Sequence, residues 1–354
     1  MNILQISFHT APMNSLGVND GGGLNVYVES ISKELAKDNT VHIITGEQAK
    51  NISKKNLKLS SFNLFTNQAN TEEKKEFLDE FIEKTFQYIE EHEIDVVHAH
   101  YWLSGLVAKE IKQRYKIPFI FTSHSLGVFI QENGLDRISA EKEIFNSADK
   151  ITASSQFEKE NLLNRYGADK LKIHIVTPGL NKKTFKAFRG EKRKNIILSV
   201  GRIQKQKGQL KTLDLFKNLQ YRIKGLELIF VGGPSGADGE AYLTKMKNKI
   251  EELRIEEDVQ FVGSLSQKKL VKLMRKSKLL IHSAESETFG LVAIEAHRSG
   301  LPVLSTNQGS FKEIISNNED GLVSKSFEDI QVYDFIIKLF ENEEYRSQLI
   351  NNAV

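Results

Sequence analysis

The sequence predicts an α/β protein built from two doubly wound domains in series, and three observations support this prediction. The chain has 354 residues, which is too long for one ordinary core and long enough for two domains. Short apolar, β-branched runs alternate with longer amphipathic segments, a pattern typical of parallel sheets with helices on both faces. The pattern restarts near residue 195, after a lysine-rich stretch. We therefore predict domains at 1–185 and 186–354, joined at about 180–193 and facing each other across a cleft.

The expected strands follow this alternation along the chain. In the first half, the apolar runs predict strands at 2–8, 40–45, 94–98, 118–122, 150–153 and 172–176. In the second half, they predict strands at 195–200, 226–231, 258–262, 278–282 and 301–304. Open parallel sheets bind their ligands at the carboxyl ends of the strands. We therefore expect the functional residues to follow these strands directly.

The composition excludes several classes of protein. With 40% hydrophobic and 27% charged residues the chain reads as a globular protein, and no apolar run is long enough to span a membrane. The chain starts with a strand-like segment rather than a signal sequence and contains no cysteine, so disulfides, thiol catalysis and cysteine-bound zinc are excluded and a cytoplasmic protein is expected. The formal net charge of +3 gives no indication of a nucleic-acid partner, and none is predicted. The basic run at 182–194 is most simply a solvated connection.

Three consecutive glycines, Gly21–Gly23, follow the first predicted strand at a distance of about a dozen residues. A dinucleotide fingerprint would need a tighter turn and a third glycine where this chain has Val26, so binding of NAD or FAD is disfavoured. We predict instead that the glycines adopt positive φ and expose N–H groups at the start of a helix over 24–37, where a phosphate can bind. The alternative is a flexible turn with Asp20 capping that helix.

Charged residues also follow predicted strands of the second half. Arg202 and Lys207 come after the first of these strands, and such a pair is common at a pyrophosphate. Glu287 and Glu295 are eight residues apart, or about 12 Å along a helix, which is too far for the two carboxylates of a glycosidase. The spacing suits the two ends of an elongated ligand, with phosphate between them on the N–H groups at 289–291. The alternative reading makes both glutamates surface residues.

The motifs of the whole chain resemble those of the retaining glycosyltransferases of family 4, whose two Rossmann-like domains form the GT-B arrangement. In the second half the resemblance is carried by Gly201-Arg-Ile-Gln204, Lys207-Gly208, Val231-Gly-Gly-Pro234, and the pair Glu287 and Glu295. In the first half it is carried by His9-Thr-Ala-Pro12, Asp20-Gly-Gly-Gly-Leu-Asn-Val-Tyr-Val28, Asp95-Val-Val-His-Ala-His-Tyr-Trp-Leu-Ser-Gly105 and His124-Ser-Leu-Gly127. These first-half segments are similar to family members that act on an inositol phosphate or a sugar phosphate. Ser125 stands where the inositol branch has threonine, which favours the sugar-phosphate branch.

The resemblance implies a role for individual residues. The nucleotide-sugar donor would be bound by Gly23, Arg202, Lys207, Glu287, Thr288, Phe289, Gly290 and Glu295. Within this set the basic pair would hold the pyrophosphate, Glu295 the ribose, and 287–290 the hexose. The phosphorylated acceptor would be bound by Asn25, Lys75, Tyr101, Ser125 and Arg137. The catalytic set would be His124, beside the transferred sugar, with Arg202, Lys207 and Glu287.

The implied reaction moves a hexosyl unit from a UDP-sugar, either UDP-glucose or UDP-N-acetylglucosamine, to a phosphorylated sugar or inositol, with retention at the anomeric carbon. The departing phosphate would take the acceptor's proton, and no metal or other cofactor is predicted. A metal site at His98, His100 and His124 is the weaker alternative, as is a packing role for the last of these. A nucleotide-sugar epimerase and a non-catalytic sugar-nucleotide-binding protein also remain open. The family's final crossover helix is expected to be missing, and a homodimer is left open.

Overall fold

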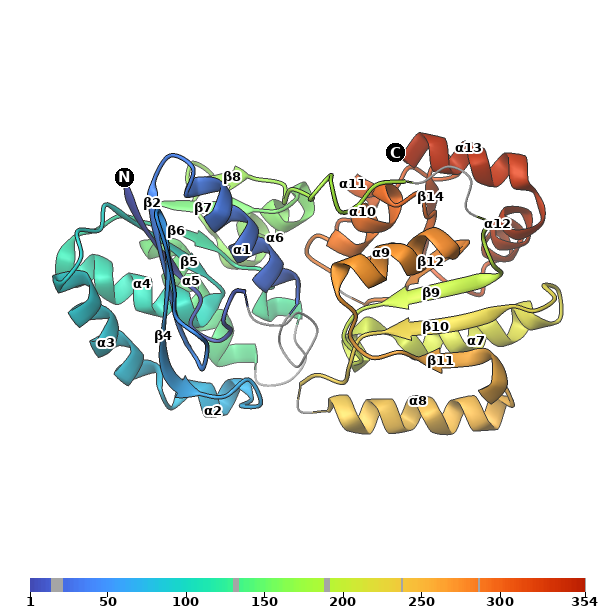
Figure 1. The fold of residues 1–354 in the computed structure, drawn as a ribbon, viewed down its shortest axis with the longest axis horizontal. Helices are drawn as coiled ribbons and strands as arrows, with labels where there is room; N and C mark the ends of the chain where they lie inside the picture. Colours follow the sequence, from blue (N-terminus) through green and yellow to red (C-terminus); the bar gives the residue numbers. More distant parts are fainter. Residues whose placement is uncertain (14–21, 130–133, 188–191, 237, 286, 354) are drawn as a thin grey trace. The chain divides into compact units, whose positions relative to one another are not determined.

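The computed structural model of the chain describes residues 1–13, 22–129, 134–187, 192–236, 238–285 and 287–353. Contacts between residues divide it into two compact units, one ending at Pro178 and the other with its main part from Gly179 to the end. Both are α/β units on a mainly parallel sheet, which confirms the predicted fold class of two Rossmann-like domains (Figure 1). In the ranges given above, no helix has the length and apolar character needed to cross a bilayer.

The first unit is built on an eight-stranded sheet within the described residues, in the order β3-β4-β2-β1-β5-β6-β7-β8. All neighbouring pairs are parallel except β3 and β4. The strands are β1 (Asn2–Ile6), β2 (Thr40–Glu47), β3 (Ile52–Lys54), β4 (Leu57–Phe65), β5 (Val96–His100), β6 (Phe119–Thr122), β7 (Lys150–Ala153) and β8 (Ile173–Ile175).

Helices connect these strands and bury their apolar faces against the sheet. They are α1 (Gly23–Leu35), α2 (Thr71–Lys75), α3 (Leu78–Glu90), α4 (Trp102–Tyr115), η1 (Gly127–Phe129), α5 (Gly134–Ser147) and α6 (Gln156–Tyr166). Side chains of α3 to α6 pack with one face of the sheet in a single apolar core. The ends of α6 show how local sequence sets its length. Ser155 accepts a hydrogen bond from the N–H of Glu158 at its start, and Gly167 ends it with φ +68°.

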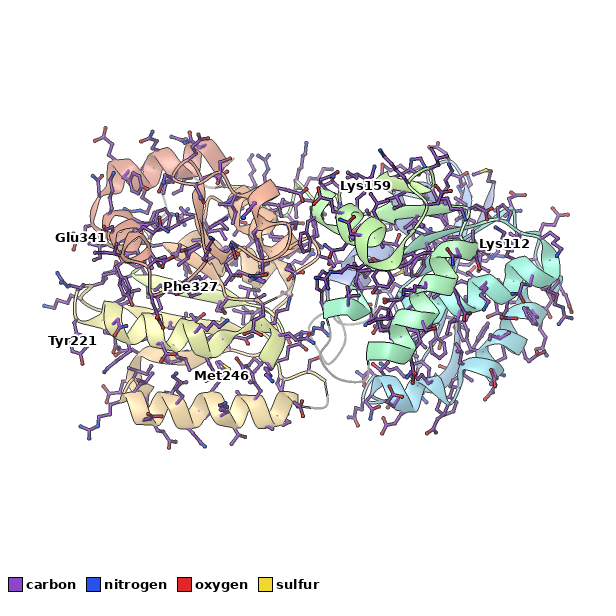
Figure 2. The ribbon with its side chains drawn as sticks, turned by 180° about the vertical axis from the view of Figure 1, so that it is seen from behind. Lys112, Lys159, Tyr221, Met246, Phe327 and Glu341 are labelled. Carbon is purple, nitrogen blue, oxygen red and sulfur yellow. The ribbon has the colours of Figure 1, made fainter. Side chains whose placement is uncertain are left out.

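The second unit has a six-stranded parallel sheet in its described part, in the order β11-β10-β9-β12-β13-β14. Its strands are β9 (Ile196–Val200), β10 (Glu227–Val231), β11 (Val259–Phe261), β12 (Leu279–His282), β13 (Val303–Thr306) and β14 (Gly321–Ser324). Its helices are η2 (Lys205–Lys207), α7 (Gln209–Gln220), α8 (Gly239–Leu253), η3 (Glu256–Asp258), α9 (Gln267–Lys276), α10 (Leu291–Arg298), α11 (Phe311–Ile314), α12 (Ile330–Glu341) and α13 (Glu343–Ala353). Met246 and Phe327 belong to its core, whereas Tyr221 is exposed (Figure 2).

The structure differs from the predicted elements in three strands and in the place of the boundary. The strands β3, β4 and β14 were not predicted, and the antiparallel pair β3–β4 departs from an all-parallel sheet. The units divide between Pro178 and Gly179, whereas the sequence pattern placed the boundary between 185 and 186. The reason is that Phe185 is fully buried in the core of the second unit, so the segment before β9 already belongs to that unit.

Candidate functional site

A row of polar side chains crosses one face of the first sheet near the carboxyl ends of its central strands. Residues in register on parallel strands point to the same face, and the register pairs Gln5 with His98 and His100 with Thr122. The sheet continues to β2 beyond β1 and to β6 beyond β5, so β1 and β5 flank the point where the strand order reverses. Open parallel sheets bind ligands at such a point. His98 and His100 share a face as predicted, with ring centroids 4.1 Å apart.

The histidines of this row are bonded to protein partners and are neutral. His98 Nε2 lies 2.8 Å from Thr122 Oγ1, and His100 Nδ1 lies 3.0 Å from His124 Nε2. Burial lowers the pKa of His98 to about 4, and burial together with His98 and His9 lowers the pKa of His124 to about 3. Within the described ranges, no three His, Asp or Glu side chains are grouped so as to hold a metal ion. His124 is therefore placed as a neutral hydrogen-bonding residue after β6.

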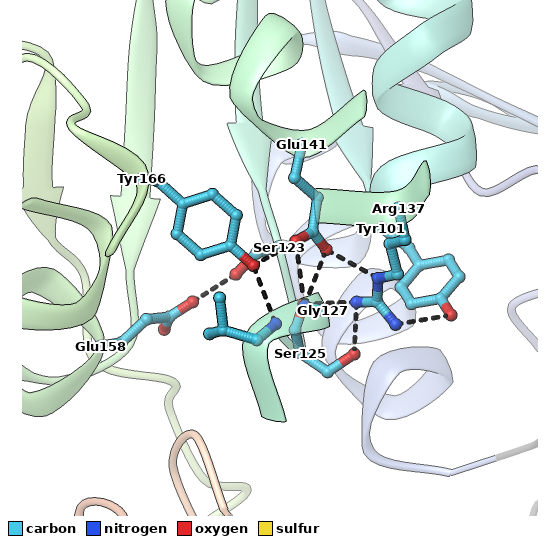
Figure 3. Close-up of polar contacts among 9 residues, drawn as sticks. Tyr101, Ser123, Ser125, Gly127, Arg137, Glu141, Glu158 and Tyr166 are labelled. Atoms are coloured by element: carbon cyan, nitrogen blue, oxygen red, sulfur yellow. Dashed lines mark hydrogen bonds and ion pairs between the residues drawn. The ribbon is translucent and has the colours of Figure 1, made fainter. Parts of the chain in front are cut away.

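Three of the residues predicted to bind the acceptor lie together in the first unit, and we call Tyr101, Ser125 and Arg137 the arginine cluster (Figure 3). Nη1 of Arg137 donates to the Tyr101 hydroxyl at 3.2 Å. Nη2 donates to the carbonyl oxygen and the hydroxyl of Ser125 at 2.7 and 3.0 Å. The guanidinium also lies over the Tyr101 ring, 4.8 Å from its centre. Segments following β5 and β6 thus meet α5, although their role in binding stays a prediction.

Glu141 holds the guanidinium of the arginine cluster from one turn further along α5. Its Oε1 accepts a hydrogen bond from Arg137 Nε at 2.7 Å, and both side chains are buried. Its Oε2 accepts from the N–H of Gly127 at 2.9 Å and from the Tyr166 hydroxyl. Burial and the nearby Glu141 carboxylate raise the pKa of Tyr166, which therefore stays a neutral donor. One carboxylate thus ties α5 to η1 and α6 (Figure 3).

The other residues predicted to bind the acceptor are placed differently. Asn25 is buried and donates from Nδ2 to the carbonyl oxygen of Ala11 at 3.3 Å. Lys75 bonds to Glu72 at 2.8 Å, and its Nζ lies 5.2 Å from the centre of the Trp102 ring. In the described part of the chain, no hydrogen bond or ion pair joins either residue to the arginine cluster. Their proposed binding role rests on the resemblance alone.

The glycine loop before α1 corrects one expectation. Positive φ was predicted for Gly21–Gly23, but Gly22 has φ −138° and Gly23 is already the first helical residue. Gly21 and Asp20 lie outside the described residues. The helix runs over Gly23–Leu35 rather than 24–37, and Gly22 serves as its N-cap. The free N–H groups of a first helical turn are still present here, and they are the feature that phosphate binding needs.

In the second unit, the predicted basic pair and Glu287 gather where the strand order reverses between β9 and β12. Lys207 ends η2 after β9, and its Nζ lies 2.6 Å from Glu287 Oε2. Burial would raise the pKa of Glu287, but the charges of Lys207, His282 and Arg202 lower it to about 2. The carboxylate is therefore ionised at neutral pH, in one electrostatic group with both predicted basic residues.

Two glycines give this second-unit site its backbone shape. Gly208 has φ +64°, and a Cβ there would lie 2.2 Å from the carbonyl oxygen of Ser283. Gly290 has φ +81° and caps α10, where a Cβ would lie 2.6 Å from the ring of Phe311. Residues 287–289 therefore lie in the segment just before the helix, as predicted, and Glu295 lies within it.

Comparison with known proteins identifies the family. Residues 21–183 match the family model described as Glycosyltransferase Family 4, and residues 181–354 match the one described as Glycosyl transferases group 1. A D-inositol 3-phosphate glycosyltransferase of Nocardia farcinica is 31% identical over 356 residues, spanning 92% of this chain and 78% of that protein. The chain belongs to the family 4 glycosyltransferases. Another protein of that name, from Frankia alni, is 29% identical to this glycosyltransferase, and the alignment covers 98% of this chain and 92% of that protein.

Solved structures show that the glycosyltransferase has the GT-B fold. A sucrose-phosphate synthase from Thermosynechococcus elongatus superposes with a TM-score of 0.88 at 24% identity, covering 99% of this chain and 92% of that one. The HepE protein of Anabaena, in complex with UDP-glucose, superposes with a TM-score of 0.78 at 17% identity, covering 100% of this chain and 93% of that one. Because both structures are less than 25% identical to this chain, the superpositions establish its fold alone.

Three residues beside the predicted sites of the glycosyltransferase were missed by the sequence analysis. Glu141 and Tyr166 support the arginine cluster, and His282 Nε2 lies 3.5 Å from Glu287 Oε2. One signal was available, because Arg137 and Glu141 stand four residues apart and oppositely charged residues at that spacing meet on a helix. No such spacing in the sequence points to Tyr166 or His282, because each contacts its partner only once the chain is folded.

Proposed function

We propose that this glycosyltransferase transfers a hexosyl unit from a UDP-sugar, UDP-glucose or UDP-N-acetylglucosamine, to a phosphorylated sugar or inositol, with retention at the anomeric carbon. The relatives named D-inositol 3-phosphate glycosyltransferase, one of them 31% identical, support the acceptor class. The structural neighbour in complex with UDP-glucose supports the donor. The second unit supplies all of the proposed donor residues except Gly23, which belongs to the first unit together with the proposed acceptor residues.

The observation that carries the proposal is the chemistry of the arginine cluster. A phosphate offers only hydrogen-bond acceptors, so a phosphate site needs donors and positive charge. The hydroxyls of Tyr101 and Ser125 each accept a bond from Arg137, which leaves the proton of each hydroxyl to be donated. Among the described residues, four of the five N–H groups of Arg137 have protein partners, and the fifth is on Nη1. The cluster therefore keeps three donors for an incoming phosphate group, while the charge of Arg137 is paired with Glu141.

The proposed donor site stabilises the leaving group by charge. Arg202 and Lys207 would neutralise the diphosphate that departs, so the proposal assigns no metal ion. Three carboxylates of the first unit are buried among the described residues, and the protein holds each of them. Glu47 accepts from the N–H of Ala11, Glu141 is paired with Arg137, and Glu158 accepts from Ser123 and from the N–H of Ser154. The proposal gives none of them the role of nucleophile. The acceptor hydroxyl would attack the anomeric carbon from the same face that the diphosphate leaves. The departing diphosphate would take the proton of that hydroxyl.

The decisive experiment measures release of UDP and formation of product by mass spectrometry. UDP-glucose and UDP-N-acetylglucosamine are each supplied alone, with fructose 6-phosphate, and with inositol phosphate. Release of UDP that depends on a phosphorylated acceptor is the expected result. Interconversion of the sugar without an acceptor would show an epimerase instead, and binding of UDP-sugar without turnover would show a non-catalytic protein. Either outcome would reject the proposal.

Removing the two hydroxyls of the arginine cluster is expected to weaken acceptor binding selectively. The double variant Tyr101→Phe with Ser125→Ala loses two donors to phosphate at about 1 kcal/mol or more each, so the acceptor KM should rise about 30-fold or more. The Arg137–Glu141 pair stays intact, and the donor KM should not change. Tyr115→Phe is a matched control, because Tyr115 lies at the far end of α4 and, among the described residues, its hydroxyl donates to the exposed Glu90. An unchanged acceptor KM would place the phosphate elsewhere.

Binding of the donor is expected to weaken as the pH falls through 7. Burial raises the pKa of Glu295 to about 7, and the ionised carboxylate can accept one ribose hydroxyl on each oxygen, whereas protonation turns one of these oxygens into a donor. The ionised fraction falls about tenfold between pH 8 and pH 6, and the affinity for UDP should fall with it. Calorimetric titration of UDP into the wild type and into Glu295→Gln measures this effect, since the variant reports the protonation of UDP itself. Equal pH slopes in the two proteins would contradict the assignment of Glu295 to the ribose.

A further inference from the structure

One residue of the first sheet is unexpectedly polar. Gln5 lies in β1 among Ile3, Leu4 and Ile6 and is fully buried. Its Nε2 has no hydrogen-bond partner among the described residues, although a buried amide without a partner costs stability. Its Oε1 lies 2.5 Å from His100 Nε2. The one strong interaction of this costly side chain is therefore with a buried histidine.

The contacts of Gln5 set the direction of two successive hydrogen bonds. An amide oxygen only accepts, so Nε2 of His100 must carry a proton and donate it. A neutral imidazole has one protonated nitrogen, so Nδ1 of His100 must then accept. The partner of that atom is Nε2 of His124 at 3.0 Å, which must therefore be the donor. We call Gln5, His100 and His124 the tautomer network.

Both histidines of the tautomer network are neutral, as this reasoning requires. Burial, followed by the neighbouring histidines, holds the pKa of His100 well below its usual range, and burial holds that of His124 at about 3. The ring of Tyr27 packs edge-on against both imidazoles, with centroids 5.8 Å from His100 and 5.0 Å from His124. Neither ring can gain a second proton near neutral pH, and neither can turn without displacing its neighbours.

We propose that Gln5 and His100 are positioning residues that keep the proton of His124 on Nε2, so that Nδ1 of His124 can act toward a substrate only as a hydrogen-bond acceptor. The matching substrate group is a hydroxyl of the transferred sugar, whereas a phosphate oxygen, which has no proton to give, does not match. The link to the sugar rests on the proposed function, but the tautomer does not. Rotating the Gln5 amide by 180° would place Nε2 on His100 and reverse both bonds, leaving His124 protonated on Nδ1.

The test reads the tautomers directly by nitrogen NMR on the full chain labelled with 15N-histidine, without substrate. Two-bond proton–nitrogen correlations distinguish a protonated ring nitrogen from an unprotonated one, and single histidine variants assign the signals. The expected result is protonation on Nε2 in both His100 and His124. Gln5→Leu, which removes the accepting oxygen and suits a buried strand, should give a mixture of tautomers at both. His42 on β2 provides an internal reference, since its Nδ1 lies 2.8 Å from the Tyr88 hydroxyl, away from the tautomer network.

Kinetics separate a positioning role from a structural one. Gln5→Leu should lower kcat/KM for transfer about tenfold, the effect of one lost hydrogen bond in the transition state, while the acceptor KM and the melting temperature stay close to wild type. Tyr88→Phe removes the partner of His42, away from the tautomer network, and should leave both tautomers unchanged. The proposal is overturned if wild-type His124 carries its proton on Nδ1, or if Gln5→Leu changes neither the tautomer nor the rate. If no acceptor supports transfer but Nε2 of His124 is protonated, the proposed function fails and the tautomer network stands.

Discussion

Replacing Lys207 with methionine is expected to reduce kcat for transfer about 100-fold to 1000-fold while the protein remains folded. Methionine keeps most of the length of the side chain but removes the charge that would neutralise the departing diphosphate. Lys207 also provides the strongest attraction that lowers the pKa of Glu287, at 2.6 Å from its carboxylate. The substitution should therefore raise the pKa of Glu287 as well. Steady-state rates at saturating donor and acceptor, with circular dichroism as the check on folding, measure the effect.

A matched lysine lies four residues further along the chain. Lys211 is paired with Glu285 at 2.9 Å, but its side chain is 53% exposed and the ion pair is at the surface. Lys211→Met removes the same charge from the same unit and should leave kcat within about twofold, because exposed ion pairs contribute little. If Lys207→Met retained wild-type turnover, the diphosphate would have to bind elsewhere. If both variants lost activity equally, the effect would be one of general charge and not of a site.

Replacing Glu141 with alanine is expected to destabilise the first unit by about 3–5 kcal/mol. The substitution leaves the buried guanidinium of Arg137 without its carboxylate, and it removes the acceptor of the Tyr166 hydroxyl and of the N–H of Gly127. Trp102 is the only tryptophan of the chain and belongs to α4, so its fluorescence during urea unfolding reports on the first unit. The urea midpoint should fall strongly while the slope of the transition is unchanged.

Glu143 offers the control for this stability prediction. It lies on the same helix and bonds to Lys109 at 2.6 Å, but its side chain is 57% exposed. Glu143→Ala should change the free energy of unfolding by no more than about 0.5 kcal/mol. Glu141→Gln keeps hydrogen-bonding oxygen at the buried position and should fall between the two alanine variants. A midpoint for Glu141→Ala equal to that of Glu143→Ala would contradict the view that this carboxylate holds the cluster together.

Most of the fold could be predicted because the central strands can be recognised from their own short sequences. Strands such as β6 and β10 are mostly apolar and mostly buried, and these stand out from the amphipathic helices between them. β4 was missed because the prediction followed continuous apolar runs, whereas Leu57–Phe65 alternates buried and partly exposed residues and includes two serines in its middle. β14 was missed because four residues, one of them glycine, give too little pattern. In both cases, pairing with a neighbouring strand supplies what the local sequence lacks.

The candidate site was predictable only in part, for a different physical reason. Strand ends mark where functional residues can gather, and this placed Arg202, Lys207 and Glu287 together. The meeting of Arg137 with Tyr101 depends instead on how α5 packs, which no spacing in the sequence specifies. The φ of Gly22 was predicted wrongly because three glycines permit positive φ but do not require it.

Tyr101 and His124 follow the adjacent strands β5 and β6, and both have backbone angles that are normally left to glycine. Tyr101 has φ +74° and ψ +155°, and His124 has φ +59°. Such conformations cost a non-glycine residue on the order of 1–3 kcal/mol, which the rest of the first unit must offset. Stability and activity therefore oppose each other at these two positions. A glycine at either would relax the main chain and also remove a side chain on which the proposed reaction depends, so selection for heat resistance alone would favour loss of function there.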